Sequence, residues 1–469
     1  MLEADLVILG AGPAGMAASR RAAEAGLSVL LLDEQQRAGG QIYRDVERAA
    51  KTRGGILGPD FTKGLDLVRA LEHPKIRHIA GAVVWQIEEG TRVAFSVDGK
   101  ASVATGKRLL IATGALERPM PVPGWTLPGV MTAGAAQILL KQSGFVCENA
   151  VLAGTGPLLY LVAAQMVRAG TPPLALVETQ TSSDLRASLA HFGGALRGWK
   201  YLVKGLSLIA ELRKAGVRRY KGATGIAIEG EGKAEALVFN ANGRHHHLAC
   251  ATVLLHHGVV PNTQTARSIG VSHRWSDGQH CFVPEKDIWG RTAIADVFIA
   301  GDGAGIGGAV AAALAGELAA LEIARDLGAA TMGERDATAA PLRRRLDGEL
   351  AARPFIDRAY PPFSEALAPA DETIVCRCEE VTAGDIRRYA GLGCLGPNQT
   401  KAFGRSGMGP CQGRYCGLTV TELLASANGR THDDTGYYRI RPPLKPVTLG
   451  ELAALEDGLN NDEAKEPAE

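Results

Sequence analysis

The segment from residue 4 to residue 33 constrains the fold more than any other part of this sequence. An apolar run at 4–9 leads into Gly10-Ala-Gly12-Pro-Ala-Gly15, an alanine-rich stretch continues to about residue 25, and a second apolar run ends at Asp33. In such a unit the first glycine permits a tight turn, the second admits a pyrophosphate to the backbone, and the third lets the helix pack on the strand. The segment therefore predicts a nucleotide-binding β-α-β unit and an α/β fold.

Three later motifs favour FAD as the nucleotide. They are Gly39-Gly40-Gln41, the Ala112-Thr113-Gly114 end of a strand over 108–112, and Gly301-Asp302-Gly303 before a long alanine-rich helix. We expect Asp302 to bind the ribityl chain and the following helix N-terminus to face the flavin. Asp33 is expected to bind the adenosine ribose, with Glu34 as the alternative. The candidate FAD residues are Gly10, Gly12, Gly15, Asp33, Glu34, Gly40, Gln41, Thr113, Gly114, Gly301 and Asp302.

A second nucleotide fold is expected between the halves of the first. A strand at 150–153, the turn Gly154-Thr-Gly156-Pro-Leu-Leu159 and a strand ending at Glu178 nearly repeat the first spacing. Leu159 replaces the third glycine, which we expect to push the helix off the strand and distort the seat of a dinucleotide. Glu178 suits a ribose with free hydroxyls and disfavours NADP. Productive NAD(H) binding, another adenine nucleotide and an empty structural fold all stay open.

Two groups of histidines are further functional candidates. His256 and His257 lie where the chain returns to the first domain, so contact with a flavin or a partner competes with a purely structural role. The run 245–247 follows Asn242-Gly243, a hairpin signal, and is most simply an exposed strand.

Four cysteines form two closely spaced pairs at the ends of one small unit, Cys376-Arg-Cys378 and Cys411-Gln-Gly-Arg-Tyr-Cys416. The single residue between the first two fits zinc poorly, and a disulfide is disfavoured in a reducing compartment. The pairs therefore predict a 2Fe–2S cluster held by four thiolates. Neighbouring glycines, including Gly407, are expected to point backbone N–H groups at the sulfurs. The cysteines at 147, 250, 281 and 394 are expected to be buried apolar side chains.

The bulk composition excludes some partners. The chain has 51 basic and 50 acidic residues, so its net charge of +1 gives no footprint for nucleic acid or an anionic membrane. The first strand lies too close to Met1 for a cleavable leader, and no apolar stretch is long enough to cross a bilayer. We expect a cytoplasmic protein without direct membrane insertion, in which any membrane association is peripheral and made through partners.

The sequence also resembles a known family. The stretch from Gly407 to Cys416 resembles the cluster domain of bacterioferritin-associated ferredoxin, and 256–262 with the flavin motifs resembles the alpha subunits of opine oxidases, D-hydroxyproline dehydrogenases and hydrogen cyanide synthase. The resemblance implies a partner beta subunit like D-amino-acid oxidases, which oxidises the substrate, while this chain relays electrons through FAD and 2Fe–2S. Further candidates are a small gamma subunit, as well as a second nucleotide or FMN at a subunit interface. No residue here is a convincing general base.

The expected architecture is a glutathione/thioredoxin-reductase-like flavoprotein with two dinucleotide-binding domains and a small C-terminal helical domain. Residues 1–118 and 250–328 form the FAD domain, 119–249 the inserted domain, 329–370 a surface linker, 371–428 the cluster domain and 429–469 an extended arm. The expected function is that of an electron-transfer alpha subunit of an amine, opine or D-hydroxyproline dehydrogenase. A self-sufficient NADH-dependent FAD/iron-sulfur oxidoreductase is the alternative.

Overall fold

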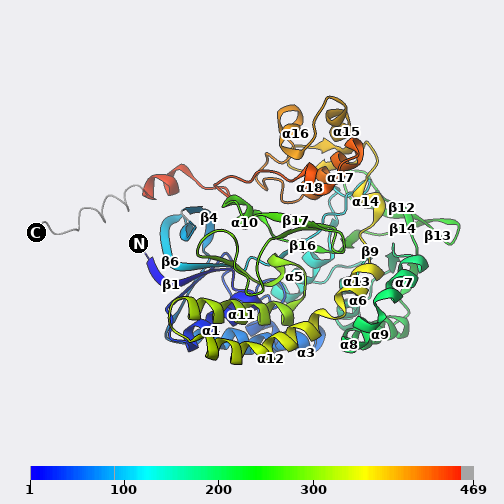
Figure 1. The fold of residues 1–469 in the computed structure, drawn as a ribbon. Coiled ribbons are helices and arrows are strands. Elements are labelled where there is room, and N and C mark those ends of the chain that lie inside the picture. The colour runs from blue at the N-terminus through cyan, green and yellow to red at the C-terminus, as the bar shows by residue number, and fades with distance from the viewer. Residues whose placement is uncertain (1, 89, 456–469) are drawn as a thin grey trace, which may run out of the picture.

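The computed structural model describes residues 2–88 and 90–455 and contains two large sheets and a small helical domain (Figure 1). The first sheet has the order β3-β2-β1-β6-β5-β4, with β19 beside β6. β1, β2, β3, β6 and β19 are parallel, so the loops at 10–15, 112–114 and 301–303 leave the sheet at one edge. The strands are β1 Leu2–Leu9, β2 Val29–Asp33, β3 Ile76–Ala80, β4 Val83–Glu88, β5 Arg92–Val97, β6 Lys100–Ile111 and β19 Val297–Ile299.

Two helices of small residues cover one face of this sheet. α1 (Pro13–Glu24) and α11 (Ala309–Asp326) approach so closely that a Cβ on Gly316 would lie 2.1 Å from the carbonyl oxygen of Ala14. This packing explains the alanine-rich sequence of both helices, because larger side chains would separate them. The remaining helices here are α2 Val46–Leu57, α3 Pro59–Thr62, α4 Gly64–Arg69, η1 Ala70–Glu72, α10 Gln264–Ser268 and η3 Gly301–Ala304.

The inserted domain has its own parallel sheet in the order β11-β10-β9-β15-β8, with a second, antiparallel sheet β12-β13-β14. β15 completes the parallel sheet, so the predicted boundary at residue 249 is wrong and this domain continues through His257. Its strands are β8 Val130–Thr132, β9 Ala150–Thr155, β10 Ala175–Glu178, β11 Arg218–Lys221, β12 Thr224–Glu229, β13 Ala236–Ala241, β14 Arg244–Ala249 and β15 Thr252–His257. Its helices are α5 Ala133–Ser143, α6 Pro157–Arg168, α7 Ser182–Ser188, η2 Leu189–His191, α8 Phe192–Arg197 and α9 Trp199–Lys214.

Short strand pairs connect the units. β7 (Ala115–Glu117) pairs with β16 (Val259–Pro261) at the crossing between the two large domains. β17 (His273–Ser276) and β18 (Cys281–Pro284) form a hairpin.

The predicted linker at 329–370 is mostly helical. It contains α12 Met332–Leu350, α13 Arg353–Ala359 and α14 Ser364–Leu367. Thr331 caps α12 in a capping box with Glu334, and Ala339 and Leu342 pack on Leu314, Leu318 and Leu321 of α11. The expectation of an irregular linker was wrong because the prolines at 354 and 361–362 mark helix starts and ends rather than an extended chain.

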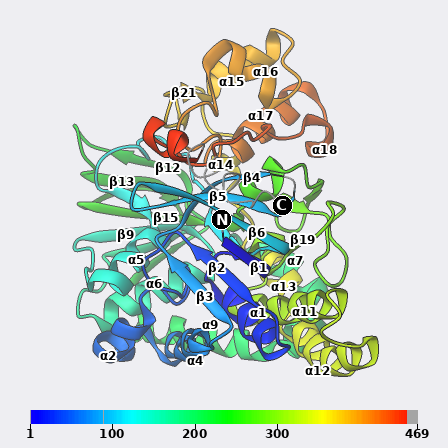
Figure 2. The same cartoon turned by 90° about the vertical axis from the view of Figure 1, so that its left-hand side faces the viewer.

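The small domain sits above the first sheet (Figure 2). It contains β20 Ile374–Cys376, β21 Val381–Thr382, α15 Ala383–Gly391, α16 Pro397–Gly404, α17 Gly417–Asn428 and α18 His432–Thr435. Thr382 caps α15, as the sequence predicts. The predicted arm is part of this domain at its start, because Tyr438, Ile440 and Leu444 are buried in the domain's core. Residues 456–469, predicted as the end of the arm, lie outside the described residues.

Candidate functional site

The first glycine turn is closed by contacts that only glycine permits. A Cβ on Gly10, whose φ is +104°, would lie 2.6 Å from the carbonyl oxygen of Ala112, and one on Gly15 would lie 1.9 Å from the carbonyl oxygen of Gly10. A Cβ on Gly40 would lie 2.9 Å from the Cα of Gly12, so the second predicted motif lies against the first. The structure therefore gathers Gly10, Gly12, Gly15 and Gly40 at the N-terminus of α1, where a diphosphate is favoured.

The two candidate ribose carboxylates have different surroundings. Asp33 is buried, and its two oxygens accept hydrogen bonds from the backbone N–H groups of Ala11 (2.5 Å) and Gln35 (2.7 Å). Burial raises the pKa of Asp33 despite those bonds. Glu34 is half-exposed and forms an ion pair with Lys445 of the C-terminal segment at 2.8 Å. Asp33 thus shapes the glycine turn, and Glu34 is the carboxylate that a ribose can reach.

The other predicted FAD residues lie at the ends of β6 and β19. The Thr113 hydroxyl donates to the carbonyl oxygen of Asn262 (3.3 Å), and the Asn262 N–H donates to the carbonyl oxygen of Gly114 (2.9 Å). A Cβ on Gly303 would lie 3.3 Å from that same Gly114 oxygen, which brings the 112–114 and 301–303 loops together. One oxygen of Asp302 accepts from the N–H groups of Gly307 and Gly308, both at 2.9 Å, just before α11.

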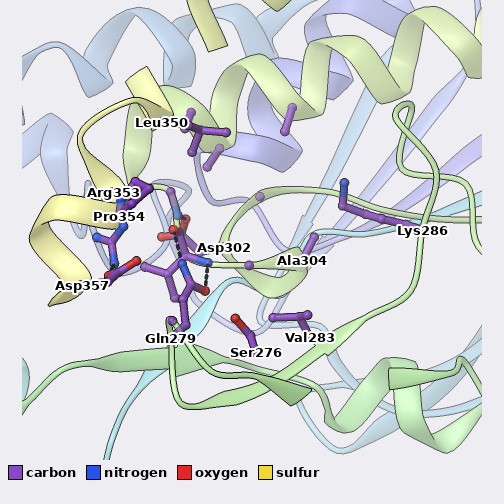
Figure 3. Close-up of a pocket in the computed structure, with 18 of the residues that line it drawn as sticks. Ser276, Gln279, Val283, Lys286, Asp302, Ala304, Leu350, Arg353, Pro354 and Asp357 are labelled. Carbon is purple, nitrogen blue, oxygen red and sulfur yellow. Dashed lines mark hydrogen bonds and ion pairs between the residues drawn. The ribbon is translucent and has the colours of Figure 1, made fainter. Parts of the chain in front are cut away.

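A cavity of about 800 Å³ opens beside Asp302 (Figure 3). Its walls are η3 with the start of α11, the β17–β18 hairpin, and the α12–α13 turn. Gln279 closes one side by donating to the carbonyl oxygen of Ile306 (2.9 Å) and accepting from its N–H (3.0 Å), and Arg353 pairs with Asp357 on another side. Burial raises the pKa of Asp357 despite this partner. The volume lies in the range of cofactor and small-molecule sites.

The four cysteines of the small domain lie as two pairs, each with one member from either end of the motif. The sulfurs of Cys378 and Cys411 are 3.7 Å apart, and Cys376 forms a hydrogen bond with Cys416. Two sulfurs on one tetrahedral ion with bonds of about 2.3 Å lie about 3.8 Å apart. Within residues 2–88 and 90–455, no three His, Cys, Asp or Glu side chains share a metal-binding centre. The arrangement therefore suits two metal ions with two thiolates each better than a single ion.

Backbone groups stabilise negative charge on one of these sulfurs. The hydrogen bond with Cys416 is the largest influence on Cys376 and outweighs burial, and N–H groups of Gly407, Glu379 and Cys378 add to it, so the pKa of Cys376 falls to about 6. Gly409 is required close by, since a Cβ there would lie 2.2 Å from the Cβ of Cys378. The other four cysteines are buried, as predicted, and Cys394 belongs to the small domain's core.

In the second nucleotide fold, the carboxylate that would bind a ribose already has partners. Glu178 is 1% exposed, and it accepts hydrogen bonds from the Tyr160 hydroxyl, the Gln180 amide (3.2 Å) and the Arg219 guanidinium (2.7 Å). Burial, followed by the Glu178 charge, raises the pKa of Tyr160. Leu159 is also buried in the apolar core around α6 rather than displacing that helix. Both features favour the structural role among the alternatives for this fold.

The paired histidines are buried at the domain crossing. His256 lies 2.6 Å from Glu117, whose other oxygen accepts from the Gly134 N–H, and His257 bonds the carbonyl oxygen of Pro119 at 2.7 Å. Burial holds the pKa of His257 well below its ordinary value. These contacts make both histidines structural residues. The run 245–247 lies on β14, the exposed strand that the sequence predicts.

Comparison with known proteins places the chain in a family. Residues 4–316 match the pyridine nucleotide-disulphide oxidoreductase model and residues 370–456 the sarcosine oxidase A3 domain. The first subunit of opine oxidase from Rhizobium meliloti (strain 1021) is 44% identical over 454 residues, which are 96% of this chain and 98% of that protein. The chain belongs to this opine oxidase family. It is thus an FAD-dependent oxidoreductase and, like the members of this family, one subunit of a larger enzyme.

More distant similarities extend the family. Hydrogen cyanide synthase subunit HcnB of Pseudomonas protegens is 31% identical and covers 94% of this chain and 96% of that protein. Among solved structures, L-proline dehydrogenase from P. horikoshii has a TM-score of 0.69 at 18% identity over 96% of this chain and 79% of that one. T. acidophilum thioredoxin reductase has a TM-score of 0.50 at 19% identity over 70% of this chain and 99% of that one. These structures confirm the predicted two-domain flavoprotein fold.

Sequence reasoning missed the cavity walls of this opine oxidase relative. Gln279, Arg353 and Asp357 lie in a hairpin and in the supposed linker, and no motif marks them. An i, i+4 Arg–Asp pair at 353 and 357 was the available signal for a helix there. Among the described residues, no helix combines the length and apolar character needed to cross a bilayer.

Proposed function

We propose that this chain is the electron-transfer subunit of a heteromeric amine, opine or D-hydroxyproline dehydrogenase. It holds FAD at the first nucleotide fold and a 2Fe–2S cluster on Cys376, Cys378, Cys411 and Cys416, and its partner is a beta subunit similar to D-amino-acid oxidases that carries out substrate oxidation. A small gamma subunit, together with FMN at a subunit interface, completes the proposal. When bound, FAD supplies two-electron chemistry and the cluster one-electron transfer.

The observation that carries the proposal is the contact between the cysteine loop and the flavin side of the first domain. The Gln264 amide donates to the carbonyl oxygen of Gln412 at 3.2 Å, one residue from Cys411. Gln264 lies two residues after Asn262, which holds the Thr113–Gly114 loop. Gln412, whose φ is +51°, also donates to the carbonyl oxygen of Pro443. The predicted FAD and cluster residues are therefore linked by a short, hydrogen-bonded path.

The residues present suit both groups. For FAD, the glycine turn offers backbone N–H groups at the N-terminus of α1, and Glu34 lies at the end of β2. For the cluster, the two sulfur pairs offer one cysteine from each motif to each iron, and the amide of Gly407 faces Cys376. Buried Cys376 and Cys416 lie on the protein side, and Cys378 lies on the surface, where a partner can approach.

The NADH-dependent alternative is disfavoured by the partners of Glu178. A ribose would have to displace Arg219 and Tyr160 from a carboxylate that is 1% exposed, which would leave a buried charge unpaired. We expect NADH mixed with the purified chain in a stopped-flow spectrometer to leave the flavin absorbance unchanged. Rapid bleaching by NADH alone would reject the relay proposal in favour of the alternative.

The cluster assignment is tested with Cys411→Ser. We expect this variant to keep the flavin absorbance and to lose bound iron together with the visible and EPR signals of the cluster. Cys394→Ser is the matched control, because this thiol is in the same domain but is packed in its core. Full iron content in Cys411→Ser, or equal losses in both variants, would reject the ligand set.

A further inference from the structure

The helices α7, α8 and α9 of the inserted domain expose an unusual number of large apolar side chains. Trp199 is 58% exposed and Leu206 is 67% exposed, whereas soluble proteins usually keep such side chains at least partly covered. Of the five tryptophans, all within the described residues, Trp199 alone is exposed. The exposed set, which we call the apolar stripe, consists of Leu189, Phe192, Leu196, Trp199, Val203 and Leu206.

The stripe follows helical spacing. Its members are separated by three or four residues throughout, so within each helix they lie on one face. The opposite faces are occupied, because Leu208 and Leu212 of α9 are buried against α6, and α13 packs on α7 and α8. Figure 1 shows these helices together at one end of the molecule, away from the small domain. The stripe is therefore an outer surface and not part of a core.

The same segment carries a local excess of positive charge. Between Ser182 and Lys214 there are six basic and two acidic residues, a net charge of +4 in a chain whose total is +1. The two acids are paired with arginines from neighbouring elements, Asp184 with Arg358 at 3.4 Å and Glu211 with Arg168 at 2.6 Å. The basic residues interleaved with the stripe are Arg186, Arg197, Lys200, Lys204, Arg213 and Lys214.

We propose that this face binds directly to the surface of a bilayer that contains anionic lipid. Leu, Phe and Trp on one side of short helices with Lys and Arg around them is the composition of segments that lie in the membrane interface. A protein–protein interface fits less well, since the cores of such interfaces are depleted in lysine, whereas Lys200 and Lys204 adjoin the stripe. The lysine and arginine stems can extend along the apolar surface while their charges reach the phosphates.

The full-length, FAD-loaded chain is tested by co-sedimentation with vesicles. We expect binding to vesicles of equal parts phosphatidylcholine and phosphatidylglycerol, little binding to phosphatidylcholine alone, and release as the ionic strength rises. Trp199 fluorescence should shift to shorter wavelength on binding. The variant Leu196→Gln/Trp199→Gln/Leu206→Gln should bind about tenfold more weakly or less, with unchanged flavin content, because these side chains are exposed.

The control variant is Met332→Gln/Leu392→Gln, which removes equally exposed apolar side chains on α12 and in the small domain. It should bind vesicles as the wild type does. The proposal is overturned if wild type does not bind anionic vesicles at low salt, or if both variants lose binding equally. It is also overturned if light scattering shows that the stripe instead joins two copies of the chain, or if only a purified beta subunit binds it. None of these outcomes depends on the electron relay.

Discussion

The two nucleotide folds of this chain begin alike and differ where a ligand would enter. Each has a glycine turn, a helix that starts with proline and a second strand that ends in an acid. In the first, Gly15 lets the helix contact the turn and Glu34 stays accessible. In the second, Leu159 fills the core and Glu178 binds Tyr160 and Arg219. The spacing thus sets the backbone path, and two side chains decide whether the site is open.

The strongest test makes the first fold resemble the second. Gly15→Leu would bring the new side chain onto the Gly10 carbonyl, which lies 1.9 Å from an ideal Cβ, so the turn must move. We expect FAD content to fall by more than about tenfold, because the pyrophosphate seat is lost. The measurement is the ratio of flavin to protein absorbance after purification.

The matched control is Leu159→Ala in the second fold. This change creates a cavity and costs about 2–5 kcal/mol of stability, but it should leave FAD content unchanged. A Gly15→Leu protein that retains FAD would show that the first turn is not the FAD seat. Loss of FAD from Leu159→Ala alone would reverse the roles assigned to the two folds.

A smaller effect is expected from removing the acid of the second fold. Glu178→Ala leaves Arg219, whose side chain is 19% exposed, without its partner, and the Tyr160 hydroxyl unsatisfied. We expect a local destabilisation of about 2–4 kcal/mol. Hydrogen exchange of the amides in β9 and β10 measures it, because exchange reports the free energy of local opening.

Glu211→Ala is the control, since it breaks the more exposed pair with Arg168 in the same domain and should cost less than about 1 kcal/mol. Unchanged protection in Glu178→Ala would contradict the structural role of this carboxylate. A loss of NADH binding without a loss of protection would show that it binds a ribose.

The sequence predicted the parts of the site that depend on backbone turns. Gly10, Thr113 and Asp302 lie far apart in the chain, yet the ends of parallel strands bring their loops together as expected. The order of the two large domains and the cap at Thr382 were also predictable, because both depend on short local patterns.

What the sequence did not predict depends on distant side chains or on local excess. The partners of Glu178 come from residues 160 and 219, and no spacing rule connects them. The position of Asp33 at the end of its strand favours it over Glu34 as the ribose ligand, but its oxygens are taken up by backbone N–H groups. A net charge of +1 for the whole chain concealed the basic segment between residues 182 and 214.

The contact between the two folds gives the smallest expected effect. The Lys141 side chain of α5 is buried and donates to the Gln41 carbonyl (3.0 Å) in the first fold and to Gln137 (2.8 Å). Burial, aided by the charge of Arg44, lowers its pKa from 10.5 to about 7. Between these values the unfolded chain holds a proton that the folded chain lacks, so the unfolding free energy should rise with pH, by about 1.4 kcal/mol per unit.

Lys141→Met should therefore remove one proton's worth of slope from the unfolding free energy between pH 7 and 9.5, measured by urea unfolding with flavin release as the signal. At pH 7.5 the variant should be no less stable than wild type, since the cost of burying an amine offsets the two lost hydrogen bonds. Gln137→Leu is the control, because it removes one of those hydrogen bonds and no titrating group. Equal slopes in wild type and Lys141→Met would mean that the amine stays protonated in the fold, and the inserted domain would then hold Gln41 through a charge rather than a neutral donor.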